Sequence, residues 1–127
     1  MRCILLISVI FAMCTSTALA DMKVVTKRAR AGEFDQLSDI RCAQDIGEVL
    51  ISCHGAVARD ATSAVLVVTF PTGFKRMLMF EGGEFQRANT TMSGVGTDTD
   101  WSLSDGLYRV RVDDQQFEIP VALISGM

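Results

Sequence analysis

Two tight-turn signals near the C-terminus constrain the fold of this chain more than any other feature. Asp105-Gly106 is a strong two-residue hairpin signal, and Asp113-Asp114 is a weaker one. If both turns form, they fix how three consecutive strands pair. The predicted opposite pairs are Asp100 with Arg111, Trp101 with Val110, Leu103 with Tyr108, Val110 with Phe117, Tyr108 with Ile119, and Arg109 with Glu118.

This register sorts the side chains of the region by polarity. The apolar face collects Trp101, Leu103, Tyr108, Val110, Val112, Phe117 and Ile119. The opposite face collects Asp100, Ser102, Arg109, Arg111, Gln116 and Glu118. A slip of one residue would turn the whole apolar set toward water. The sequence therefore predicts an antiparallel unit with one buried and one charged face.

Strand-like runs continue upstream. Residues 64–70 and 74–80 are rich in β-branched and aromatic residues and are separated by Pro71-Thr72-Gly73. Further strands are expected at 40–43 and 50–57, and residues 89–96 are expected to form a polar loop. The predicted fold class is all-β, as a small antiparallel sandwich or a barrel-like meander.

Residues 1–20 have the pattern of a signal peptide. Arg2 precedes an apolar run over residues 3–14, and Ala18-Leu19-Ala20 offers a small-x-small cleavage site. Twelve residues are too short to cross a hydrocarbon core of about 30 Å. An uncleaved anchor, a buried helix and acylation of Cys14 are the alternatives, although Met13 stands where a small residue usually precedes an acylated cysteine. We expect a periplasmic or secreted protein.

Charge is distributed unevenly after residue 20. Residues 21–30 contain one acidic residue, Asp21, and four basic residues, namely Lys23, Lys27, Arg28 and Arg30. The net charge of the residues downstream is negative. We expect residues 21–38 to be a basic arm, either flexible or an edge strand, followed by one β domain at 39–127. The arm is a candidate for contact with an anionic membrane surface, and a solvated terminus is the simpler interpretation. The acidic overall balance argues against nucleic-acid binding.

Cys42 and Cys53 are the only cysteines after residue 20. In an exported domain of this size, such a pair is first interpreted as a disulfide. They enclose the turn-like Asp45-Ile46-Gly47, and a loop of this length corresponds to roughly 3 kcal/mol of stabilisation. A metal or redox pair is disfavoured, because neither a CxxC motif nor clustered His/Cys spacing is present.

None of the candidate catalytic or metal-binding residues has the spacing that the corresponding motif requires. His54 follows Cys53 directly, which suggests a catalytic Cys-His pair. Adjacent strand residues point to opposite faces, however, so these two side chains cannot easily form a hydrogen bond. A calcium loop starting at Asp98 would need glycine and glutamate where Leu103 and Arg109 stand. Met77 and Met79 share a strand face, which fits core filling better than a copper site. We therefore expect no enzymatic activity, no cofactor and no metal site.

Three arginines are candidate contacts for an acidic partner, namely Arg76, Arg109 and Arg111. The alternative is a solvated face whose charges pair across strands.

Several short motifs resemble a group of uncharacterised small exported proteins of Gram-negative bacteria. The matching residues are Cys42, Cys53, Pro71-Thr72-Gly73, Phe80-Glu81-Gly82 and Phe117-Glu118-Ile119-Pro120-Val121-Ala122, the last set aligning with a Tyr-Glu-Ile-Pro-Asp-Ala-like segment. This sequence has Phe117 in place of the tyrosine and Val121 in place of the aspartate. The resemblance implies a periplasmic address and supplies no activity.

Two functional hypotheses follow. The first is a non-enzymatic binding or inhibitor-like protein of the cell envelope, acting through an exposed sheet face or the polar loop. The second is a structural accessory of the envelope, held to an anionic surface by the basic arm.

Overall fold

A computed structural model describes residues 17–89 and 97–126. Eight strands and two helices follow in chain order: α1 (Thr17–Arg30), β1 (Gln36–Ala43), β2 (Ile51–Arg59), β3 (Ser63–Thr69), β4 (Lys75–Glu81), β5 (Glu84–Ala88), β6 (Thr99–Ser104), β7 (Leu107–Val112), β8 (Gln115–Pro120) and α2 (Val121–Ser125). The predicted signal peptide up to residue 16, including Cys14, and most of the predicted polar loop (90–96) lie outside the described residues.

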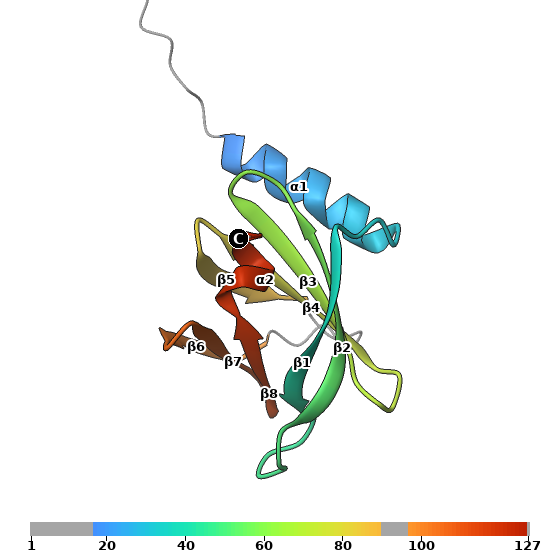
Figure 1. Ribbon diagram of the computed structural model, residues 1–127, viewed down its shortest axis with the longest axis vertical. Helices are drawn as coiled ribbons and strands as arrows, with labels where there is room; N and C mark the ends of the chain where they lie inside the picture. The colour runs from blue at the N-terminus through green and yellow to red at the C-terminus, as the bar shows by residue number, and fades with distance from the viewer. Residues whose placement is uncertain (1–16, 90–96, 127) are drawn as a thin grey trace, which may run out of the picture.

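All strands belong to one antiparallel sheet in the order β5-β4-β3-β2-β1-β8-β7-β6. The sheet curls into a nearly closed, barrel-like shape (Figure 1). Its two edge strands, β5 and β6, come into contact but form no ladder in the described part of the chain. We call the gap between them the seam. The all-β prediction is confirmed, in its barrel-like form.

The predicted C-terminal register is also confirmed. Trp101 lies opposite Val110, which in turn lies opposite Phe117. Asp105 and Asp113 adopt positive φ angles of 53° and 52° at the two turns. Aspartate tolerates this conformation better than most residues, so the turn chemistry and the polarity of the faces specify the same pairing.

Side chains from all sides of the sheet fill the barrel interior. The ring centroids of Phe80 and Tyr108 are 5.0 Å apart, and those of Phe70 and Phe117 are 5.7 Å apart. These rings are almost fully buried. Eight strands enclose a space that side chains can fill, so this interior is a hydrophobic core.

Residues 21–30 differ from the expected flexible arm or edge strand, because they form most of α1. The missed signal is the apolar spacing of Met22, Val25 and Ala29, which places these residues on one helix face. Val25 and Ala29 are buried against residues of β2, β3 and β4, namely Ala58, Val65 and Met79. Figure 1 shows α1 lying across the outside of the sheet. The helix ends where Gly32 adopts a φ of 75° and Glu33 N–H donates to the Arg28 carbonyl. No described helix has the length and apolar character needed to span a membrane.

A polar clamp fixes the C-terminal end of α1 to the sheet. Arg28 Nη2 lies 2.7 Å from Asp35 Oδ1, and Arg28 Nη1 donates to the Arg59 carbonyl. The other carboxylate oxygen of Asp35 accepts the Arg59 N–H at 2.7 Å. These hydrogen bonds, first from the Arg59 backbone and then from Arg28, lower the pKa of Asp35.

The predicted disulfide between Cys42 and Cys53 is present and joins β1 to β2 inside the barrel. The two strands also approach closely at Gly55, where an added Cβ would lie 2.6 Å from the Ser38 carbonyl oxygen. Glycine is therefore required there by space. The disulfide thus joins β1 and β2 next to their connecting loop, and Gly55 lets the two strands pack closely farther along the ladder.

Replacing both Cys42 and Cys53 with alanine is expected to lower the free energy of unfolding by about 3 kcal/mol, because the unfolded chain regains the freedom of the closed loop. Urea denaturation of the variant and of the reduced native protein measures this loss. The two losses should agree, and a loss well below about 1 kcal/mol would contradict the structural role.

The Asp35 clamp predicts a specific pH dependence. Because folding lowers the pKa of Asp35, its contribution is present at neutral pH and disappears as the pH falls below about 4 toward the lowered pKa. Asp35→Asn should therefore destabilise the protein at pH 7, and the gap to the native protein should shrink with acidification. Urea denaturation across this pH range tests it, and a pH-independent gap would contradict it.

Candidate functional site

A shallow hollow lies on the outer face of β6, β7 and β8, on the face predicted to be charged. Its volume is about 240 Å³, and it is lined by Leu50, Asp100, Trp101, Ser102, Arg109, Val110, Arg111, Gln116, Phe117 and Glu118. We call it the arginine hollow. The structure thus brings two of the three predicted arginines, Arg109 and Arg111, together around one concave surface.

The arginines of the hollow are held in place by short polar contacts. Arg109 Nη1 donates to Ser104 Oγ at 2.7 Å. Arg111 lies 3.3 Å from the carboxylate of Asp98 and donates to the Asp113 carbonyl at 3.0 Å. Ser104 is the last residue of β6, Asp98 directly precedes β6, and Asp113 lies in the β7–β8 turn. Held this way, Arg109 is exposed and Arg111 is half-buried. Guanidinium groups can bind a carboxylate through paired hydrogen bonds.

The β1–β2 loop borders the hollow and exposes apolar side chains. Val49 is 80% exposed, Ile46 is 73% exposed and Ile51 is 48% exposed, while Leu50 forms part of the wall of the hollow. Arg41 Nη2 donates to the Leu50 carbonyl at 3.1 Å. We call residues 44–51 the braced loop, because the Cys42–Cys53 disulfide closes its base.

The sequence pattern predicted a turn at Asp45-Ile46-Gly47 and a strand from Leu50, and the braced loop was not predicted as a candidate site. The available signal was the presence of several large aliphatic residues between two cysteines, where a solvated loop is usually polar. A loop whose base is closed by a disulfide and whose apolar side chains are exposed resembles the anchor regions of protein–protein interfaces.

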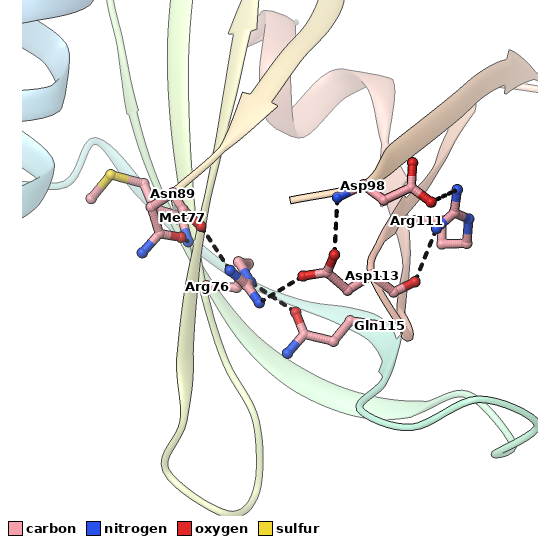
Figure 2. Close-up of polar contacts among 7 residues, drawn as sticks. All are labelled: Arg76, Met77, Asn89, Asp98, Arg111, Asp113 and Gln115. Atoms are coloured by element: carbon pink, nitrogen blue, oxygen red, sulfur yellow. Dashed lines mark hydrogen bonds and ion pairs between the residues drawn. The ribbon is translucent and has the colours of Figure 1, made fainter. Parts of the chain in front are cut away.

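Arg76 is not part of this surface, which corrects its prediction as an accessible partner contact. Arg76 lies on the same, inward-pointing face of β4 as Leu78 and Phe80, so only 2% of the residue is exposed. Figure 2 shows its guanidinium enclosed between β4 and the β7–β8 turn. Arg76 Nε donates to Gln115 Oε1 at 2.8 Å, and Nη1 donates to the Asn89 carbonyl at 2.7 Å.

The contacts of Arg76 continue into a network at one end of the barrel (Figure 2). Arg76 Nη2 lies 4.0 Å from Asp113 Oδ2, and the other carboxylate oxygen of Asp113 accepts the Asp98 N–H at 2.9 Å. Burial lowers the pKa of Arg76, and the charge of Asp113 opposes this shift. The network connects the end of β5 with the start of β6, so Arg76 serves to close the seam.

The other chemistry-bearing residues do not converge. Cys53 is buried in the disulfide, whereas His54 points outward and pairs with Asp39 at 3.1 Å. Met79 packs beneath α1, and Met77 lies beside the same cluster. Within residues 17–89 and 97–126, no group of three or more His, Cys, Asp or Glu side chains is arranged to hold a metal ion.

Comparison with protein-family models, curated proteins and solved structures found no match to this chain.

Arg76→Ala is expected to lower the free energy of unfolding by about 2–3 kcal/mol, because it removes charge-assisted hydrogen bonds and leaves buried acceptors without donors. Arg109→Ala is the matched control on the outer face and should change it by no more than about 0.5 kcal/mol. Urea denaturation of both variants measures the difference. Equal losses would show that Arg76 has no special role in closing the seam.

Proposed function

We propose that this protein is a non-enzymatic, protein-binding or inhibitor-like module of the cell envelope. The observation that carries the proposal is the adjacency of the braced loop and the arginine hollow, which share Leu50. Apolar side chains on the loop supply anchors, and Arg109, which pairs with no carboxylate in the described part of the chain, supplies the charged contact for an acidic rim. Arg111 is already engaged by Asp98 and lies beside Arg109 in the hollow.

The packed interior supports a surface-based function. Aromatic and aliphatic side chains occupy the inside of the barrel, so a partner is expected to bind on the outside. The disulfide supports function in an oxidising compartment, and the predicted signal peptide supports export to it.

The restraints on the loop also favour binding. A partner that contacts Ile46 and Val49 would not need to order a flexible segment, since the disulfide and the Arg41 contact already restrain residues 44–51. Pre-organisation of this kind reduces the entropic cost of association.

Site-specific photocrosslinking in intact cells tests the proposal. A crosslinking residue at Val49, and separately at Ser102, should yield the same discrete adduct with one envelope protein. Gln86 on the exposed side of β5 is the control position and should not yield it. Arg109→Glu combined with Arg111→Glu should abolish the adduct at Val49. Identical adducts at all three positions, or no adduct at Val49 and Ser102, would contradict the proposal.

A further inference from the structure

The structure regroups the basic residues near the N-terminus. Arg28 does not act with Lys23, Lys27 and Arg30, because its guanidinium is engaged by Asp35 and by the Arg59 carbonyl. Arg87, which is far away in the sequence on β5, takes its place beside the other three. Its Nε lies 3.2 Å from Met79 Sδ, which holds the side chain against the outer face of the sheet.

Helix geometry places the three cations of α1 on one side. At about 100° per residue, Lys23, Lys27 and Arg30 fall within about 60° of each other around the helix axis. Asp21, the acidic residue of the helix, lies about 150° away from their centre. The basic side of α1 is therefore separate from both its acidic residue and its packed face, which contains Val25 and Ala29.

These residues surround a hollow whose charged side chains are all positive. It has a volume of about 250 Å³ and is lined by Met22, Lys23, Thr26, Lys27, Arg30 and Arg87. No acidic residue lines it, and within the described residues none of its four cations forms an ion pair. We call Lys23, Lys27, Arg30 and Arg87 the basic patch. Such a concentration of positive charge on an acidic protein creates a local field that attracts anions.

We propose that the basic patch docks the protein onto an anionic lipid surface. Two apolar side chains lie near the cations. Val24, which is 52% exposed, neighbours Lys27 around the helix but lies outside the hollow, and Met22 lines the hollow while packing against the cluster beneath α1. Cations mixed with aliphatic side chains on a surface helix suit a lipid interface, where charge meets headgroups and apolar groups meet acyl chains. A soluble polyanion would use the cations alone. This proposal is independent of the protein-binding function, because the arginine hollow uses different strands.

Vesicle flotation tests the proposal with the protein as recovered from expressing cells. The protein should float with vesicles of phosphatidylcholine mixed with phosphatidylglycerol, and not with pure phosphatidylcholine. Lys23→Gln combined with Lys27→Gln should weaken binding by about 25-fold, since each cation near an anionic surface contributes roughly fivefold. Arg87→Gln should weaken it by roughly fivefold, although Arg87 is remote in sequence. Binding should also weaken as the salt concentration rises.

Arg109→Gln combined with Arg111→Gln is the matched control. It removes the same charge from another face, so binding to the mixed vesicles should change by no more than about twofold. Equal weakening by the two double variants would overturn the proposal, because net charge alone would then explain binding. Binding to soluble polyphosphate without flotation would also overturn it. Val24→Ser should still float with the mixed vesicles, but with one tenth or less of the native affinity. An unchanged affinity would overturn the apolar contribution to docking.

Discussion

Arg76 and Tyr108 each connect parts of the sheet that lie on opposite sides of the seam. Arg76 reaches from β4 to Gln115 at the start of β8 and to the carbonyl of Asn89 at the end of β5. At the other end of the barrel, the Tyr108 hydroxyl donates to the Gly83 carbonyl at 2.5 Å, which joins β7 to the β4–β5 turn. Side chains thus perform the closure that a ladder between β5 and β6 would otherwise provide. The enclosed core depends on this closure.

Because side chains fill the closed barrel, both proposed functions use the outside of the molecule. Two external surfaces differ in chemistry and in location. The braced loop and arginine hollow combine aliphatic anchors with arginines, whereas the basic patch combines cations from α1 and β5. We have proposed the first surface for a folded protein partner and the second for an anionic lipid surface.

The sequence predicted the fold best where two physical constraints agreed. Around Asp105-Gly106 the turn chemistry and the alternation of polarity specify one register, and the structure has it. The burial of Arg76 was harder to predict, because β4 carries apolar residues on both faces. Met77 and Met79 on one face and Leu78 on the other leave open which face points into the barrel, and Arg76 lies on the face of Leu78. The local structure of α1 was missed because its charges outweighed its apolar spacing. Three residues of the basic patch, Lys23, Lys27 and Arg30, were predicted as part of the basic arm. Arg87 could not be predicted, since it joins them only through the tertiary fold.

Native-state hydrogen exchange of an Arg76→Met/Tyr108→Phe variant most directly tests the claim that side chains close the barrel. With both cross-seam contacts removed, the amides of β5 and β6 should lose protection first, while those of β1 and β2, which the disulfide joins, remain protected. A uniform loss of protection across all strands, or unchanged protection in β5 and β6, would contradict this account of the fold.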